Sequence, residues 1–126
     1  YVEEVLAHRT SPIITAQETD SLKDVIALFK THGVSQVPIV DSKGRPISIV
    51  AEVDVLRGLQ DGTATLASPA KAIAQRLGGL IYPKARIEEL YRIFETNQVA
   101  IVVDNEKIVG VVSQIDVIDF MSKKGR

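Results

Sequence analysis

Apolar residues in the first half of the chain occur first at helical spacing and then in short continuous runs. Between residues 22 and 29 they recur every three or four positions, which indicates an amphipathic helix that ends at Gly33. The runs at 37–40 and 47–51 indicate two buried strands, joined by a turn at 41–44. The remaining elements predicted for this half are a helix at 2–7, a strand at 12–15 and a helix at 53–59 stopped by Gly58 and Gly62.

The second half of the chain repeats this order of elements. Helical spacing over 86–96 precedes apolar runs at 99–103 and 108–112, which flank a predicted turn at 104–106. Each half is therefore predicted as helix, strand, helix, strand, strand, helix. The remaining predicted elements are a linker of small residues at 63–68, a helix at 70–76, a strand at 79–82 and a final helix at 115–121.

Two similar motifs mark this repetition. The runs SIVAEVDVL and GVVSQIDVI each lead from a strand into a helix at an aspartate, Asp54 in the first and Asp116 in the second. Their separation of about half the chain indicates a tandem duplication, with repeats at 1–62 and 63–126. Neither repeat alone could cover both faces of its small sheet, so we expect an α+β fold in which the two copies stack.

Composition limits the classes of function. The 126 residues are 45% hydrophobic, which is ample for a core, and the net charge of −1 gives no strong attraction to nucleic acid or an anionic membrane. The absence of cysteine excludes disulfides and thiolate metal sites, and a reducing, cytoplasmic location is expected. No apolar run reaches membrane-spanning length. Because the chain opens with Tyr1 inside a predicted helix, we expect a fragment of a longer polypeptide.

The most specific constellation is Ser113-Gln-Ile-Asp116 at a predicted strand-to-helix junction. One interpretation is a capping box, in which a hydroxyl and a carboxylate three residues apart satisfy the unpaired amides at a helix start. The other is a ribose site, because a carboxylate accepts the hydrogen bonds that two vicinal hydroxyls donate. The residues alone leave both interpretations open.

A second constellation is the segment GVSQVP at 33–38. It is either a helix stop followed by an edge strand, or a loop whose backbone groups face a ligand and whose Val34 and Val37 form apolar walls for adenine. The case for an enzyme is weak. His8 and His32 stand alone, and the sequence has no Ser-His-Asp order, metal pair or phosphate-binding glycine loop. We therefore predict no catalytic and no metal-binding residues.

The duplication, the element order and the motif endings together resemble a tandem pair of CBS domains, also called a Bateman module. The most specific pieces are GVSQVPIVD with SIVAEVDVL, and QVAIVVD with GVVSQIDVI. The shortened second copy and the stretch VLRGLQDG are most similar to the C-terminal regulatory region of cystathionine β-synthase. The resemblance implies two pseudo-twofold-related β-α-β-β-α repeats packed through their sheets, with two clefts for adenosyl compounds. It also implies a homodimer and allosteric control of an attached catalytic domain.

Carried over to this sequence, the resemblance makes the two clefts unequal, since each combines the loop of one copy with the Ser/Thr-x-x-Asp motif of the other. The residues of the main adenosyl site would be Pro12, Ile13, Val34, Ser35, Gln36, Val37, Ser113, Ile115 and Asp116. The second cleft lacks two loop residues, and an alanine stands where the hydroxyl is expected, so we predict a degraded site. Its residues would be Ala51, Asp54, Gln98, Val99 and Ala100.

The predicted regulatory ligand is S-adenosylmethionine, with AMP or ATP as the alternative and no catalytic cofactor. Ser113 and Asp116 would hold the ribose. Phosphates bind to basic side chains or helix N-termini, and neither sequence segment of the main site carries a basic residue. The basic residues nearest in sequence are Lys30, His32 and Arg45. An alternative of another class is a module that only dimerises and binds no ligand.

Overall fold

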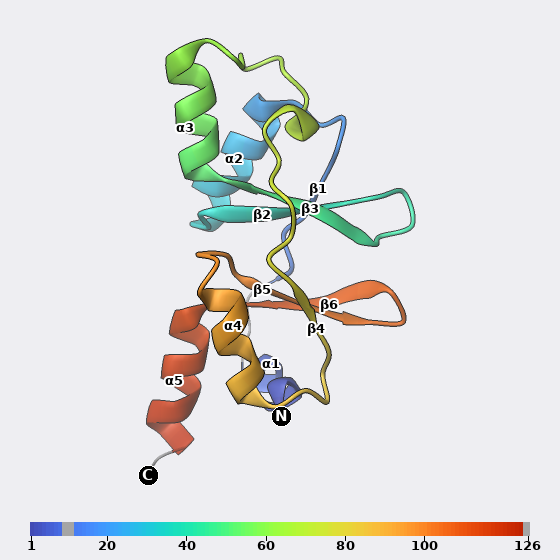
Figure 1. Ribbon diagram of the computed structural model, residues 1–126, viewed down its shortest axis with the longest axis vertical. Coiled ribbons are helices and arrows are strands. Elements are labelled where there is room, and N and C mark those ends of the chain that lie inside the picture. Colours follow the sequence, from blue (N-terminus) through green and yellow to red (C-terminus); the bar gives the residue numbers. More distant parts are fainter. Residues whose placement is uncertain (9–11, 125–126) are drawn as a thin grey trace. The chain divides into compact units, whose positions relative to one another are not determined.

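The computed structural model of the protein describes residues 1–8 and 12–124, and the chain divides into two compact units (Figure 1). One unit comprises residues 14–77, and the other comprises residues 1–13 together with 78–126. The helices are α1 (Val2–His8), α2 (Leu22–His32), α3 (Glu52–Asp61), α4 (Leu90–Phe94) and α5 (Gln114–Lys124), with short 3-10 helices η1 (Ala70–Ala72) and η2 (Ile87–Glu89). The strands are β1 (Ala16–Gln17), β2 (Gln36–Val40), β3 (Pro46–Ala51), β4 (Leu80–Ile81), β5 (Ala100–Asp104) and β6 (Lys107–Val112).

In the unit 14–77, a three-stranded sheet carries α2 and α3 on one face (Figure 1). The strand order is β1-β2-β3, with β1 parallel to β2 and β2 antiparallel to β3. Helix α2 begins where the Ser21 hydroxyl accepts a hydrogen bond from the Asp24 amide, and it ends at Gly33, whose φ of 63° suits glycine. The core of this unit includes Leu22, Val25, Phe29, Val37, Ile39, Val50 and Val55.

The other unit has the same plan with one helix added. Its strand order is β4-β5-β6, with β4 parallel to β5 and β5 antiparallel to β6, and α1, α4 and α5 lie on one face (Figure 1). Helix α1 contributes Val2 and Val5, which are fully buried, and its Leu6 lies so close to Gly110 that a Cβ there would overlap it. Their buried neighbours in this core are Ile81, Leu90, Ile93, Phe94, Ala100, Val102, Val112 and Val117.

Most of the predicted helices and strands are present, and two of the differences arise from strand pairing. The strand predicted at 12–15 is replaced by β1, because parallel pairing with β2 begins only at Ala16. The helix predicted at 70–76 is reduced to η1, because the following chain returns to pair Gln75 with Ile49 at the edge of β3. A third difference is that the predicted helix over 86–96 consists of η2 followed by α4.

Of the two glycines predicted to stop this helix, Gly62 does so, since α3 ends at Asp61 and Gly62 has a φ of 79°, whereas the prediction for Gly58 is wrong. Gly58 is buried inside the helix, where a Cβ would come within 3.1 Å of the Ala64 Cβ. This glycine therefore serves a close approach between the helix and the following segment, and not a helix stop.

The compact units and the predicted sequence repeats divide the chain differently. Helix α1 belongs by sequence to the repeat 1–62, yet it packs on β6 and α5, and its Val2 amide donates to the Ala85 carbonyl at 2.8 Å. Residues 63–77, assigned by sequence to the second repeat, lie in the unit of β1–β3. The compact units therefore do not coincide with the predicted sequence repeats. The boundary between the repeats at residues 62 and 63 stays a prediction.

Replacing Val5 by alanine should destabilise the unit that contains β4–β6. Val5 is fully buried in that core, and removing two methyl groups from such a position costs about 2 kcal/mol. The matched control is Val109→Ala on β6, because Val109 is 42% exposed and should cost about 0.5 kcal/mol or less. Urea unfolding followed by circular dichroism measures both values, and equal losses would contradict the assignment of α1 to this core.

Candidate ligand-binding residues

The first candidate group lies at the junction between β6 and α5. The backbone amide and the hydroxyl of Ser113 donate to Oδ2 of Asp116, at 2.8 and 2.9 Å, and the Asp116 amide donates to Ser113 Oγ at 3.4 Å. This is the geometry of a capping box. A carboxylate can accept about four hydrogen bonds in total, so a helix cap and a ligand contact are chemically compatible. The ribose interpretation of this pair therefore stays a prediction.

The second candidate group is the loop between α2 and β2. Gly33 turns the chain, Val34 is half-buried, and Ser35 is exposed with its carbonyl accepting the Glu52 amide at 3.0 Å. Gln36 pairs with Ala51 across the sheet. The next residue, Val37, is fully buried in the core of its unit. The loop thus presents backbone groups and the Val34 side chain, whereas the Val37 side chain packs inside.

The junction between β3 and α3 is built differently from its counterpart. Ala51 caps α3 without a side-chain hydrogen bond, as the alanine in the sequence led us to expect. Asp54 is only 8% exposed, and both carboxylate oxygens have partners in the same unit. Oδ1 accepts from Nη1 of Arg57 at 3.1 Å, and Oδ2 accepts from Nε2 of Gln75. Asp54 is therefore held by its own chain.

The shortened loop between α4 and β5 is also tied to its own unit. Asn97 has a φ of 64°, close to that of Gly33, so the left-handed turn after the helix is kept in both copies. Oε1 of Gln98 accepts the Gly78 amide at 2.6 Å. Val99 is half-buried, and Ala100 is fully buried at the start of β5.

Each unit brings one loop and one junction together at the same end of its sheet. In the unit 14–77 the loop 34–37 lies beside Ala51 and Glu52, through the Gln36–Ala51 pair. In the other unit Ala100 pairs with Val112, which places the shortened loop beside Ser113. Pro12 and Ile13 are exposed and belong to that second unit. The clefts implied by the family resemblance draw on both units and stay predictions.

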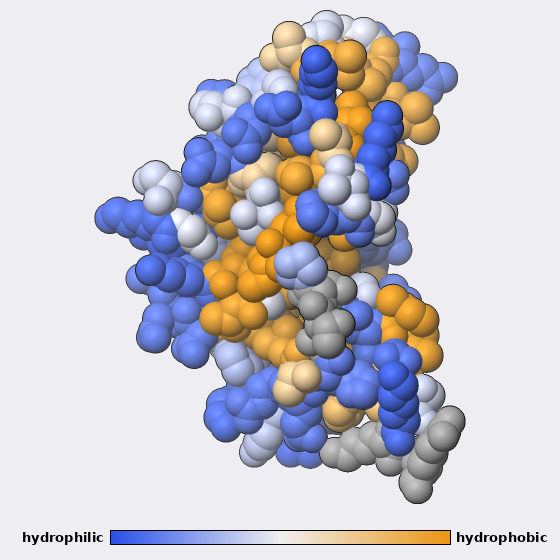
Figure 2. Space-filling model, turned by 180° about the vertical axis from the view of Figure 1, so that it is seen from behind, coloured by the Kyte–Doolittle hydropathy of each residue, from blue (hydrophilic) through white to orange (hydrophobic). Residues whose placement is uncertain are grey.

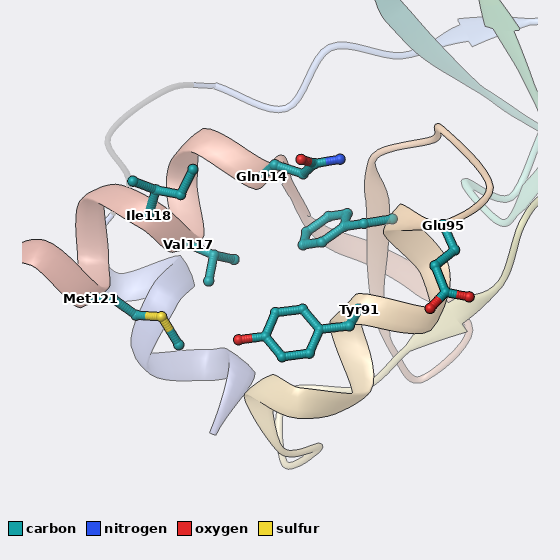
Figure 3. Close-up of a pocket in the computed structure, with 7 residues that line it drawn as sticks. Tyr91, Glu95, Gln114, Val117, Ile118 and Met121 are labelled. Carbon is teal, nitrogen blue, oxygen red and sulfur yellow. The ribbon is translucent and has the colours of Figure 1, made fainter.

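Sequence reasoning missed a groove of about 370 Å³ between α4 and α5 (Figure 3). Tyr91 extends from α4 toward Val117 and Met121 of α5, while Gln114 and Glu95 contribute the polar edge. Phe94 and Ile118 complete the lining. None of the residues predicted to bind a ligand lines this groove. The signal in the sequence was the helical spacing of the apolar residues Val117, Ile118 and Met121 in the last helix.

Within residues 1–8 and 12–124, no helix is both long enough and apolar enough to cross a membrane. The same residues contain no group of three or more histidine, aspartate or glutamate side chains placed to hold a metal ion.

Two sheet-and-helix units built on one repeated motif define a class of small tandem α+β modules. The family model named CBS domain matches residues 2–61 and 80–123 of the chain. The chain belongs to the CBS domain family. The predicted family and the predicted α+β fold class are thus confirmed.

Solved structures share this fold at low sequence identity. The CBS domain pair of protein MJ0100, in complex with 5′-methylthioadenosine and S-adenosyl-L-methionine, matches with a TM-score of 0.80 at 21% identity, covering 98% of this chain and 96% of that chain. The CBS domain protein PAE2072 from Pyrobaculum aerophilum, complexed with AMP, matches with a TM-score of 0.79 at 20% identity, covering 96% and 98%.

The curated relatives are longer than this chain. Cystathionine beta-synthase of Saccharomyces cerevisiae is 21% identical over 132 residues, which cover 88% of this chain and 26% of that protein. The uncharacterized protein MK0525 of Methanopyrus kandleri is 27% identical over 116 residues, covering 84% of this chain and 56% of that protein. The chain therefore spans about half or less of the length of these relatives.

Replacing the capping residue should lower the stability of the protein at the junction of β6 and α5 and raise it at the junction of β3 and α3. Ser113→Ala removes a side-chain cap and should cost about 1 kcal/mol, whereas Ala51→Ser places a hydroxyl where the Asp54 amide can donate and should add up to about 1 kcal/mol. Ser122→Ala, in the last turns of α5, is the control and should change stability little. Urea midpoints measure all three. A stable Ser113→Ala protein would show that the hydrogen bonds of Ser113 do not cap α5.

Proposed function

We propose that this chain is a regulatory module that binds S-adenosylmethionine and controls a protein to which it is attached. The observation that carries the proposal is the pair Ser113 and Asp116 at a strand-to-helix junction of a CBS domain pair. Proteins of the same fold were solved with S-adenosyl-L-methionine and 5′-methylthioadenosine in one case and with AMP in the other. An adenosine group is common to these three ligands, so the proposal begins with recognition of adenosine.

The ribose is the part of adenosine that suits Ser113 and Asp116. Its two neighbouring hydroxyls donate hydrogen bonds, a carboxylate only accepts them, and a serine hydroxyl can rotate to donate or accept. In the proposed main site Asp116 and Ser113 hold the ribose. Val34, which is half-buried, and Ile115, which is 65% exposed, offer apolar surface to the adenine. The backbone of Ser35 and Gln36 orients the ring, and Pro12, Ile13 and Val37 complete the set.

Arg45, one of the basic residues near the loop in sequence, is engaged elsewhere. Its Nε donates to Oδ2 of Asp41 at 2.7 Å in the β2–β3 turn, and the backbone amides of Arg45 and Lys43 donate to Oδ1. The Arg45 amide, followed by its guanidinium, lowers the pKa of Asp41, so the pair stays charged at neutral pH. β2 separates this turn from the loop 34–36 by about 15 Å, since a strand rises about 3.3 Å per residue. Arg45 therefore does not serve the loop.

An acidic residue lies next to the loop instead. Glu52 is the exposed first residue of α3, and its amide donates to the Ser35 carbonyl. A carboxylate in this position repels a phosphate chain and attracts the sulfonium and ammonium groups of S-adenosylmethionine. Lys30 and His32, exposed in the last turn of α2, are the basic residues near the loop in sequence, and because of them AMP stays the alternative ligand.

A ligand regulates the attached protein only if it binds one arrangement of that protein more tightly than another. Only such a difference in affinity shifts the equilibrium between the two arrangements. We propose that the attached part is a catalytic domain of the cystathionine β-synthase type, since the yeast enzyme aligns with 88% of this chain. In that case the chemistry resides in the attached domain, and this module acts by binding alone.

The wild-type chain should be stabilised more by S-adenosylmethionine than by AMP or ATP in a thermal-shift assay. A ligand at one hundred times its Kd adds about 2.7 kcal/mol to the unfolding free energy. Asp116→Ala should weaken binding ten- to a hundredfold in calorimetry, because a hydrogen bond to a charged group is worth about 1.5–3 kcal/mol.

The matched control for this experiment is Asp119→Ala, an aspartate of the same helix that pairs with His8 and Lys123. It should leave the affinity unchanged. Unaltered binding by Asp116→Ala would refute the assignment of the main site. A wild-type chain that binds none of the three compounds would refute the adenosyl function and favour a module that only assembles.

We further propose that the module forms a homodimer through exposed apolar helix surfaces. On α3, Leu56 is 65% exposed, and on α5, Ile118 is 58% exposed beside the groove of Figure 3. Figure 2 shows hydrophobic residues exposed between hydrophilic ones on the surface. Clustered apolar surface commonly marks a protein interface, whereas single exposed apolar residues do not. The other exposed apolar residues of these two helices include Val53, Leu59 and Met121.

Charge placed on these helices should convert the dimer into a monomer. Leu56→Glu and Ile118→Glu would each bury a carboxylate in the interface, and the matched control is Ser42→Glu in the exposed β2–β3 turn. Sedimentation velocity over a range of concentrations measures the state of each protein. A wild-type chain that remains monomeric at every concentration would rule out the dimer, and dimeric Leu56→Glu and Ile118→Glu proteins would rule out this interface.

A further inference from the structure

Helices α3 and α5 each expose a row of apolar side chains at every third position. The members of the two rows are Val53, Leu56 and Leu59 on α3 and Ile115, Ile118 and Met121 on α5. Their exposed fractions lie between 38% and 65%. Because side chains three positions apart on a helix are neighbours, each row forms a continuous surface, called here the α3 stripe and the α5 stripe.

The groove between α4 and α5 lies beside the α5 stripe. Ile118 and Met121 belong to both, and Tyr91 extends from α4 toward Met121 (Figure 3). The groove has a volume of about 370 Å³, which is within the range of natural binding pockets. Both helices belong to one compact unit, so the groove is formed within that unit. It can receive apolar side chains from another helix.

The groove has an acidic edge. Glu95 is the charged residue among those that line it, and its side chain is exposed. Within residues 1–8 and 12–124, no basic side chain forms an ion pair with Glu95. Arg92, three residues earlier on α4, lines a different hollow together with Gly78 and Leu80. An apolar helix with a basic side chain at its edge therefore matches this groove.

The two stripes carry opposite charges at corresponding positions. Arg57 directly follows Leu56 on α3, whereas Asp119 directly follows Ile118 on α5. The side chain of Arg57 is 66% exposed, and its Nη1 lies 3.1 Å from Oδ1 of Asp54. A guanidinium group carries five N–H donors, so Arg57 retains donors for a second carboxylate.

A second copy of the chain can offer either stripe to the groove. The α5 stripe would bring Asp119 toward Glu95, and Lys123, which pairs with Asp119, offsets only part of the repulsion between the carboxylates. The α3 stripe would bring Arg57 toward Glu95, and these opposite charges attract. Charge complementarity therefore favours the α3 stripe as the occupant.

We propose that the α3 stripe of one copy docks in the α4–α5 groove of a second copy, with Leu56 in the groove and Arg57 beside Glu95. This inference rests on the homodimer of the proposed function, and it assigns which surfaces meet in that dimer. Each copy contributes a stripe to one contact and a groove to another, so unlike surfaces of two identical chains are joined.

Cysteine cross-linking tests which surfaces meet, because the chain has no cysteine of its own. One chain carries Leu56→Cys, and a second chain, made longer by a tag, carries Ile118→Cys. After co-expression and treatment with a short bismaleimide, the main product should join the two different variants, which its size on a denaturing gel identifies. Ser42→Cys in the exposed β2–β3 turn replaces Leu56→Cys in the matched control and should give no such product.

Products that join only chains with the same substitution would overturn the inference, although the homodimer would stand. A wild-type chain that stays monomeric at every concentration would overturn both. Binding of an adenosyl compound is measured separately by calorimetry, so neither result decides that part of the proposed function.

A double-mutant cycle tests the contact between Arg57 and Glu95. Glu95→Arg should weaken dimerisation about tenfold in sedimentation velocity, because like charges then meet. In an Arg57→Gln background the same change should weaken it about twofold or less, since the repulsion is gone. The glutamine keeps an N–H donor for Asp54. Glu88→Arg, at a residue 67% exposed and outside the groove, is the control and should leave dimerisation unchanged. Equal effects of Glu95→Arg in both backgrounds would contradict the contact.

Discussion

Both compact units depend on burying the apolar faces of their helices against one side of a three-stranded sheet. The central strand of each sheet is flanked by a parallel neighbour and an antiparallel one, which fixes where its ends lie. Because β2 and β3 are antiparallel, the start of one lies beside the end of the other, and Gln36 pairs with Ala51. Ala100 and Val112 are paired in the same way. Strand register therefore places each loop beside its junction, and side-chain hydrogen bonds such as those of Ser113 and Gln98 then hold them locally.

The duplicated aspartates show how one sequence position acquires two structural roles. Asp116 completes a local cap with Ser113. Asp54 has lost the serine and is buried, so its charge requires donors from elsewhere in the unit. Arg57 and the distant Gln75 meet this need. Because position 51 offers no hydroxyl, the hydrogen bond from Gln75 helps to offset the cost of burying this carboxylate.

The sequence predicted those features that depend on local patterns. The helix 22–32, the strands on either side of each hairpin and the cap at Ser113 follow from apolar spacing and capping chemistry, and all are present. The role of Gly58 could not be predicted, because the close approach of Ala64 arises only when the chain folds back. The contact of Gln75 with Asp54 was hidden for the same reason, since a separation of 21 residues has no periodic signature. Burial of Val37 follows from the apolar run at 37–40, which predicts a buried strand, and Val37 is fully buried in β2.

The packing of α1 has a consequence for the order in which the chain folds. The unit 14–77 is continuous in sequence, so all of its contacts can form once residue 77 has been synthesised. The other unit is discontinuous, because Val2 and Val5 bury themselves among side chains of residues 81–117. Contacts between residues so far apart form slowly, since a long loop must close before they stabilise anything. During synthesis α1 can therefore reach its place in this core only after the last strand and helix have been made.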